Sequence, residues 1–346
     1  MAPKLRWGLL GTARINRQII PALRNSKINE VWAVASRTAE HAAEFAREWN
    51  IPKTYASYAE LLADPQVDVV YNSLPNHLHA EWTIKAAQAG KHILVEKPFA
   101  LSTQEALGMA AAAEQAGVYL TEALVYRHYD QTHKVMGLLR GGEIGDVLVV
   151  RGVFTFSLNR PDDFRWKPEY GGGSAWDVGC YPVSFLNMLA GGAPQTVFAM
   201  QRRAGSGVDE TLVGQMQYPA GLLGQFVGSF KLPRHVGVEI QGTRGLLVLN
   251  SPFGISDLNR VTLKKDDKDG DEKTFSFKIN NRFQNLVDDY ARTISEHKPP
   301  LVSPLESCQI VATLEGLLES ARTGWPVSIA APAGDLSGDL FKPGAL

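Results

Sequence analysis

Hydrophobic positions in the first third of the chain form short apolar runs separated by segments with helical spacing. The runs at residues 5–10, 30–36, 68–73 and 92–95 are nearly continuous, which is typical of strands buried on both faces. Helical patterns separate these runs, at residues 15–24, 39–49, 77–89 and 103–116. This alternation predicts an α/β domain in which a parallel sheet carries helices on both faces.

The pattern changes after residue 123. A Gly-rich bend at residues 171–173 precedes a helix expected from about Ser174 to Leu189. Strands are expected at residues 147–156, 196–202, 211–217, 221–230, 236–241 and 246–250, and helices near 131–139, 283–295 and 305–323. Runs of strands predict a second domain of the α+β class. We therefore expect one domain over residues 1–123 and another over residues 124–346.

Two segments are expected to lie outside these packed domains. The charged run Lys264–Lys273 fits a solvated hairpin or loop. The tail Ala330–Leu346 is rich in Gly, Pro and Ala, and we expect it to wrap loosely or fray.

Composition narrows the classes of partner. The 346 residues include 35 Lys and Arg against 36 Asp and Glu, a net charge of -1, which gives no electrostatic basis for binding nucleic acid or an anionic membrane. No apolar run reaches the roughly 18 residues of a membrane span, and no signal-peptide pattern opens the chain. Cys180 and Cys308 lack the spacing of metal ligands. A cytoplasmic protein without metal or disulfide is expected.

The first strand ends in a turn of the kind that binds phosphate, with the sequence Gly11-Thr12-Ala13-Arg14-Ile15-Asn16 before a helix. Glycine permits close approach to a pyrophosphate, and the helix N-terminus supplies N–H groups and a positive dipole. Only the first glycine of Gly-x-Gly-x-x-Gly is present, so the turn alone equally fits an ordinary connection. Its place in the chain, with a second strand ending about 25 residues later, favours dinucleotide binding.

The end of the second strand indicates which dinucleotide. NAD sites usually place Asp or Glu there to bind the ribose 2′-hydroxyl, whereas this chain has Ser36-Arg37. A hydroxyl and a guanidinium suit a 2′-phosphate, because Arg forms bidentate, charge-assisted bonds to phosphate. The alternative is a surface arginine that caps a helix. The position favours NADP.

Lys97 follows the strand at residues 92–95, within Glu96-Lys97-Pro98. Ligands of doubly wound sheets lie at the carboxyl ends of the strands, so Lys97 is expected beside the nicotinamide. Apolar surroundings and a cationic ring would lower the pKa of Lys97 and suit it to proton transfer. The alternative is a solvated lysine.

Asp177 and Tyr181 form a second candidate pair, because a spacing of four residues places them on one helical face. The glycines at 171–173 permit close approach of a ligand or another segment. The alternative is an aspartate that complements the helix dipole beside a half-buried tyrosine.

Together these motifs resemble the glucose–fructose oxidoreductase/inositol dehydrogenase (Gfo/Idh/MocA) family over essentially the whole chain. The resemblance also rests on Pro75-Asn76-His77-x-His79 and Tyr126-Arg127-His128. It implies an N-terminal Rossmann domain and a C-terminal α+β domain with a large, open, mostly antiparallel sheet. The catalytic lysine of the family falls on Lys97 and its conserved acid on Asp177.

One position departs from many family members. Where they have histidine, this chain has Tyr181, which is similar to the branch with glucose–fructose oxidoreductase, D-xylose dehydrogenases and dimeric dihydrodiol dehydrogenase. That branch leans towards NADP, in agreement with Ser36-Arg37.

The hypothesis is hydride transfer between the nicotinamide and a sugar, such as xylose or glucose, or a related cyclic polyol. Tyr181 would exchange the hydroxyl proton, with its pKa lowered by Lys97, although the proton could equally pass through Lys97 itself. Asp177 would orient the substrate or Lys97. Substrate contacts are expected from Lys97, Tyr126, His128, Asp177 and Tyr181. Cofactor contacts are expected from Gly11, Thr12, Ala13, Arg14, Ile15, Ser36, Arg37, Leu74, Pro75, Asn76, His79, Glu96, Lys97, Arg127, Arg165 and Trp166.

Other functions stay open at this point. They are NADPH-dependent reduction of a keto-sugar or anhydrofructose, NAD-dependent glycoside cleavage on the same fold, and a cofactor-binding sensor without turnover. Strands with alternating apolar positions should hide one sheet face, so a homodimer or homotetramer is expected.

Overall fold

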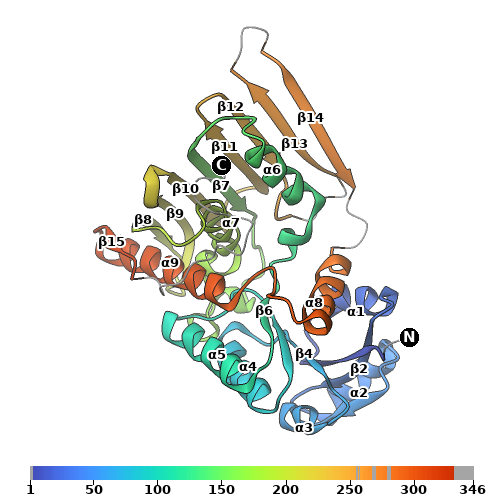
Figure 1. Ribbon diagram of the computed structural model, residues 1–346. Helices are drawn as coiled ribbons and strands as arrows, with labels where there is room; N and C mark the ends of the chain where they lie inside the picture. Colours follow the sequence, from blue (N-terminus) through green and yellow to red (C-terminus); the bar gives the residue numbers. More distant parts are fainter. Residues whose placement is uncertain (1–2, 255, 257, 267–269, 279–281, 331–346) are drawn as a thin grey trace. The chain divides into compact units, whose positions relative to one another are not determined.

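The computed structural model describes residues 3–254, 256, 258–266, 270–278 and 282–330 (Figure 1). Its described residues form two compact units. The first unit lies within Met1–Ala100, Gln104–Val125 and Asn281–Ser307, and the second within Leu101–Thr103, Tyr126–Asn280 and Cys308–Leu346. The tail at 331–346 lies outside the described residues.

The units differ from the expected continuous domains, because helix α8 (Gln284–Glu296) belongs to the first unit. The Tyr290 hydroxyl of this helix donates to the carbonyl of Ile93 at 2.8 Å, and its Val287 carbonyl accepts from the amide of Asn29. These partners lie about 200 residues or more away in sequence, so periodicity along the chain could not reveal them.

The first unit contains a six-stranded parallel sheet in the order β3-β2-β1-β4-β5-β6. Its strands are β1 (Leu5–Leu10), β2 (Asn29–Ala35), β3 (Lys53–Tyr55), β4 (Val69–Asn72), β5 (His92–Val95) and β6 (Leu120–Glu122). The helices that alternate with them are α1 (Asn16–Asn25), α2 (Ala39–Glu48), α3 (Tyr58–Ala63), α4 (His79–Gln88) and α5 (Thr103–Ala116). The expected Rossmann fold is confirmed, and the strand order reverses between β1 and β4, where such folds bind ligands.

A buried carboxyl ends strand β6. The side-chain oxygens of Glu122 accept the Phe99 N–H and the Ser307 hydroxyl, each at 2.9 Å. Burial raises the pKa of Glu122 to about 8, although both hydrogen bonds lower it. The folded protein therefore holds a proton here that the unfolded chain releases above about pH 4.5.

Glu122→Gln is expected to stabilise the fold at pH 8 relative to the unsubstituted protein. Between about pH 4.5 and pH 8 the folded state binds the extra proton, so stability falls as pH rises, by at most about 1.4 kcal/mol per pH unit. Glutamine can accept the Phe99 N–H and donate to the Ser307 oxygen without ionising. Thermal unfolding of both proteins between pH 5 and pH 9 checks this. A variant that is less stable than the unsubstituted protein, and by more at pH 8 than at pH 5, contradicts the prediction.

The second unit contains a nine-stranded sheet in the order β14-β13-β12-β11-β7-β10-β9-β8-β15. The strands are β7 (Val147–Thr155), β8 (Thr196–Arg203), β9 (Asp209–Gln217), β10 (Leu223–Ser229), β11 (His235–Gly242), β12 (Gly245–Asn250), β13 (Leu258–Lys265), β14 (Glu272–Lys278) and β15 (Val327–Ser328). Within this sheet, β7 and β10 form the only parallel pair among its described strands. The open, mostly antiparallel sheet is thus confirmed. The charged run at 264–273 joins β13 to β14, with residues 267–269 outside the described part.

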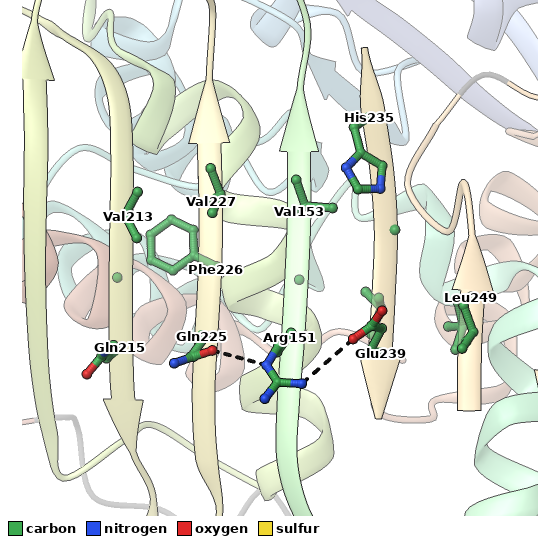
Figure 2. A pocket seen from close by; sticks show the side chains of 15 residues that line it. Arg151, Val153, Val213, Gln215, Gln225, Phe226, Val227, His235, Glu239 and Leu249 are labelled. Atoms are coloured by element: carbon green, nitrogen blue, oxygen red, sulfur yellow. Dashed lines mark hydrogen bonds and ion pairs between the residues drawn. The ribbon is translucent and has the colours of Figure 1, made fainter. Parts of the chain in front are cut away.

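Helices α6 (Asp130–Arg140), α7 (Cys180–Ala190) and α9 (Pro304–Thr323) pack on the second unit's sheet. On β7, Gly152 faces Pro182 of α7, while Arg151 and Val153 point to the other face. Figure 2 shows this open face, with Arg151 between Gln225 and Glu239. Among the described residues, no helix has the length and apolar character needed to cross a bilayer.

Candidate functional site

The predicted cofactor residues of the first unit follow its strands at one edge of the sheet. Gly11 follows β1, Ser36 follows β2, Leu74 comes shortly after β4, and Lys97 after β5. Because all these strands are parallel, their carboxyl ends meet at this edge, on both sides of the point where the strand order reverses.

The side chain of Asn16, which stands where the glycine motif has its third glycine, bridges the turn after β1. Gly11 has a φ of +84°, which favours glycine, and its carbonyl accepts the side-chain amide of Asn16 at 2.8 Å. Asn16 is fully buried, and its side-chain oxygen accepts the Ser73 hydroxyl at 2.7 Å. Asn16 stands at the position of the third glycine, and its side chain links the turn to Ser73. Around it, Thr12, Ala13 and Ile15 are partly exposed and Arg14 is exposed.

The start of α1 suits an anion. Its first turn carries no acidic residue, and no side chain among the described residues caps it. The N-terminal end of the helix dipole is therefore positive and without a carboxylate of its own, as phosphate sites at helix N-termini require.

Ser36 and Arg37 differ in exposure at the end of β2. Ser36 is buried, and its N–H donates to the Tyr55 carbonyl at 3.3 Å, whereas Arg37 is exposed. The helix cap is Thr38, whose hydroxyl accepts the His41 N–H at 3.3 Å. The alternative that Arg37 caps the helix is thus wrong, because its neighbour holds that position.

His79 supports the segment that carries Lys97. Its buried ring lies with Nδ1 2.7 Å from the Pro98 carbonyl and Nε2 2.8 Å from the Leu74 carbonyl. Burial lowers the pKa of His79 to about 4, and the charge of Lys97 lowers it as well, against the two carbonyls. A neutral His79 has one N–H and donates to one of these two carbonyls, so its ring lies packed between Leu74 and Pro98. Pro75 is exposed, and Asn76 begins a short 3₁₀ helix.

Lys97 itself is half-buried beside a carboxyl. The Glu96 side chain accepts the Tyr71 hydroxyl and, at 3.3 Å, the Lys97 backbone N–H. Burial raises the pKa of Glu96, whereas Tyr71 and the Lys97 charge lower it. Glu96 is therefore bonded within its own unit and orients the residue that follows it.

In the second unit, the helix expected from Ser174 begins with a π turn, Ala175–Gly179, before α7 starts at Cys180. Pro182 explains the difference. In a continuous α-helix its ring would clash with the Val178 carbonyl, which its missing N–H could not reach, so the chain widens before it. Asp177 lies in the π turn and Tyr181 in the α-helix, so the pair spans the junction between them and not a continuous α-helix.

Asp177 forms an ion pair with Arg165. The guanidinium Nε lies 2.7 Å from Asp177 Oδ2, and Nη1 lies 3.2 Å from Asp163 Oδ1. The carbonyl of Arg165 accepts the Gly173 N–H at 2.9 Å. Arg165 therefore binds the segment 173–177 at both of its ends, through Gly173 and Asp177. Asp163 also pairs with Arg160, and its side chain is nearly buried.

Tyr181 lies in an aromatic cluster. Its ring centroid is 5.3 Å from that of Phe154, 5.8 Å from Phe253 and 6.4 Å from Tyr126. Tyr126 is buried, with its hydroxyl 2.9 Å from that of Ser184. Its fixed ring packs against Tyr181. Arg127 and His128 are also nearly buried.

Trp166 packs in a small neighbouring cluster, which shares Phe154 with the cluster around Tyr181. Its ring contacts that of Phe230 edge-on, with centroids 5.4 Å apart, and Leu158 and Val178 complete the group. This contact supports the segment that carries Val178, beside Asp177.

Sequence reasoning missed three polar residues of the site, Asn16, Asp163 and Asp209. Asp209 begins β9, is buried and accepts bonds from Ser174 and Ala175. Helical or strand spacing along the sequence does not indicate the hydrogen-bond or ion-pair partners of these three residues, because the partners meet through folding. An aspartate opening an apolar strand was the available signal for Asp209.

Comparisons with known proteins match the folds of both units. Residues 5–124 match the family described as oxidoreductase family, NAD-binding Rossmann fold, and residues 132–248 match the GFO/IDH/MocA C-terminal domain.

Two relatives and one solved structure are similar over most of the chain. D-xylose 1-dehydrogenase (NADP(+)) 2 of Haloferax volcanii is 36% identical over 328 residues, covering 94% of this chain and 100% of the relative. Trans-1,2-dihydrobenzene-1,2-diol dehydrogenase of Sus scrofa is 35% identical over 252 residues, 72% of this chain and 75% of the relative. A 3-ketoreductase of Actinomadura kijaniata, solved with NADP and TDP-benzene, superposes with a TM-score of 0.84 at 27% identity, covering 92% and 98% of the chains.

Proposed function

Because the chain belongs to the Gfo/Idh/MocA oxidoreductase family, we propose that it transfers hydride between NADP and a CH–OH carbon of a sugar or related cyclic polyol. The observation that carries the proposal is the place of Lys97 at the carboxyl edge of the parallel sheet, on the edge that carries the Gly11 turn. The relatives named for xylose and dihydrodiol oxidation support a CH–OH substrate.

The first unit would hold the cofactor. The Gly11 turn and the start of α1 would bind the pyrophosphate through Gly11, Thr12, Ala13, Arg14 and Ile15. Ser36 and Arg37 would bind the 2′-phosphate, and the segments from Leu74 to His79 and around Glu96 would line the nicotinamide side. When bound, NADP accepts or supplies the hydride. Arg127, Arg165 and Trp166 of the second unit would complete the site.

Arg37→Ala is expected to raise KM for NADP⁺ by about 10- to 100-fold and to leave KM for NAD⁺ nearly unchanged. A charge-assisted bond to phosphate contributes about 1.5–3 kcal/mol, and NAD⁺ has no 2′-phosphate to lose it. Initial rates with both cofactors measure the effect. Arg47→Ala, an exposed arginine on α2, is the matched control, and an equal change for both cofactors would contradict the assignment.

The proposed chemistry uses three side chains. Lys97 would bind the reacting oxygen and hold its charge, and Tyr181 would exchange the hydroxyl proton. Asp177 would orient a substrate hydroxyl or Lys97. Its ion pair with Arg165 supports this role, because the bond fixes the carboxylate.

A substrate panel tests the proposed function. NADP⁺ reduction is measured with aldoses, inositols, anhydrosugars and trans-dihydrodiols, and NADPH oxidation with the corresponding keto compounds. Activity in either direction supports the proposal. The ketoreductase likeness makes the reverse direction a necessary arm of the panel. Aglycone release without NADPH would indicate a glycosidase, and binding without turnover a sensor.

The open face of the second sheet is proposed as the contact between copies of this chain. Across neighbouring strands, Val213, Val227 and Val153 stand in register and form an apolar row (Figure 2). The polar row Gln215, Gln225, Arg151 and Glu239 runs beside it. An apolar strip with a polar border suits a symmetric interface.

Val213→Arg is expected to convert the homo-oligomer to monomer, because it places a charge in the middle of the apolar row, where Val213 is 46% exposed. Sedimentation velocity measures the mass. Leu107→Arg is the matched control, since Leu107 is an equally exposed hydrophobic residue on α5. A wild-type protein that sediments as a monomer would end the proposal.

We also propose that the enzyme works in the cytoplasm, where thiols stay reduced. Cys180 and Cys308 are both buried thiols in the structure, which suits a reducing compartment. Cell fractionation with an antibody tests the location, and recovery in a secreted fraction would contradict it.

A further inference from the structure

Asp209 binds the start of the segment that carries Asp177 and Tyr181. Its Oδ2 accepts the Ser174 hydroxyl at 2.6 Å and the Ala175 N–H at 2.7 Å, and the residue is only 5% exposed. Asp209 is the first residue of β9, so the rigid sheet of the second unit provides this acceptor. Ala175 begins the π turn, two residues before Asp177.

The π turn depends on Asp209 because it lacks a cap of its own. Ser174 occupies the N-cap position, where a serine hydroxyl usually accepts an N–H of the first turn. Here that hydroxyl points away, donating to Asp209 and, at 3.3 Å, to the Gly228 carbonyl. The carboxylate of Asp209 therefore takes over the capping of the first helical N–H.

Gly173 shows how closely the carboxylate is fitted. A Cβ at position 173 would lie 2.1 Å from Asp209 Oδ1, and the φ of Gly173 is +115°. The last of the three glycines thus makes room for Asp209. This explains part of the glycine run without any ligand.

At the other end of the π turn, Pro182 prevents continuous α-helical bonding. The turn is thus fixed by contacts outside the helix, namely Asp209 at its start and Arg165 at Asp177. The carboxylate of Asp209 accepts bonds from the first two residues at the start of this turn, so it stabilises the turn from the sheet.

We infer that Asp209 is a positioning residue, which sets the place of Asp177 and Tyr181 through the π turn without touching substrate. The inference rests on the proposed function of these two residues. Displacing a catalytic group by about 1 Å can lower a rate by about 10²-fold, so the effect should appear in kcat.

Four variants test the inference. Asp209→Ala removes the acceptor, Ser174→Ala removes one donor, and Asp209→Asn keeps an acceptor for the Ala175 N–H. Asp64→Asn is the matched control, because Asp64 is also a buried aspartate that binds an N–H and hydroxyl, but at the amino-end edge of the first sheet. For each variant, kcat, KM for NADP⁺, the folded fraction at assay temperature and the isotope effect with deuterated substrate are measured.

The expected result is a fall in kcat per folded molecule of about 10- to 100-fold in Asp209→Ala. The isotope effect should rise, because misplaced groups slow the hydride-transfer step, and KM for NADP⁺ should stay within a few-fold. Asp209→Asn should recover part of kcat, and Asp64→Asn should lower stability alone.

The inference is overturned if activity in Asp209→Ala falls only in proportion to the folded fraction, with an unchanged isotope effect. That outcome leaves the proposed function standing when Lys97 and Tyr181 variants are inactive. If the Lys97 and Tyr181 variants keep full activity, the proposed roles of these two residues have failed, whereas a wild-type protein without turnover on the substrate panel means that the proposed function itself has failed.

Discussion

Lys97→Met is expected to lower kcat by about 10²- to 10⁴-fold while NADP⁺ binds within a few-fold of its original affinity. Methionine keeps the unbranched apolar stem and removes only the ammonium group, which would hold the charge on the reacting oxygen. The pyrophosphate and 2′-phosphate contacts lie elsewhere on the sheet edge, so binding should survive. Stopped-flow rates and equilibrium titration of NADP⁺ separate the two quantities.

The control for this variant is Lys85→Met. Lys85 is an exposed lysine on α4 that pairs with Glu81, so its loss should leave kcat unchanged. Retention of most activity in Lys97→Met would remove Lys97 from the chemistry. A loss of NADP⁺ binding in step with activity would instead make Lys97 a cofactor ligand only.

Tyr181→Phe is expected to lower kcat by about 10²-fold or more with little change in melting temperature. The ring packs among Phe154, Phe253 and Tyr126, and phenylalanine keeps those contacts while removing the hydroxyl that would exchange the proton. Activity across pH and thermal unfolding are both measured. A fall in kcat with an unchanged melting temperature would assign proton exchange to Tyr181 rather than to Lys97.

Tyr55→Phe provides the contrast, because the Tyr55 hydroxyl bonds Asp64 at 2.8 Å on the first sheet. Its removal should lower the melting temperature and leave kcat unchanged. A Tyr181→Phe variant with nearly full kcat would assign proton exchange to Lys97 alone.

The fold was predictable where a pattern lies within one segment. The apolar runs that became β4 and β5 were bounded by polar residues, and strands alternated with helices, so a parallel sheet followed. Strand β3 was missed because three residues carry too little periodicity. Helix α8 was expected in the wrong unit because the residues that hold it, such as Ile93, are distant in sequence.

Candidate site residues could be predicted where chemistry depends on position along a strand. Lys97 and Arg37 are such candidates, because parallel strands bring their carboxyl ends to one edge of the sheet. Asp163 and Asp209 could not be predicted in this way, because the role of a carboxylate depends on the partners that folding brings to it. These partners are Arg165 for Asp163 and Ser174 for Asp209. The π turn was missed because Pro182 acts on residues that precede it.

The most direct test of hydride transfer follows the hydrogen itself. Substrates from the active part of the panel, deuterated at the CH–OH carbon, are incubated with the wild-type enzyme and NADP⁺, and the nicotinamide product is analysed by mass spectrometry. We predict one deuterium in each reduced nicotinamide ring, and with Lys97→Met the same product formed at least about 10²-fold more slowly. Tight NADP⁺ binding without transfer from any substrate, in either direction, would contradict the account.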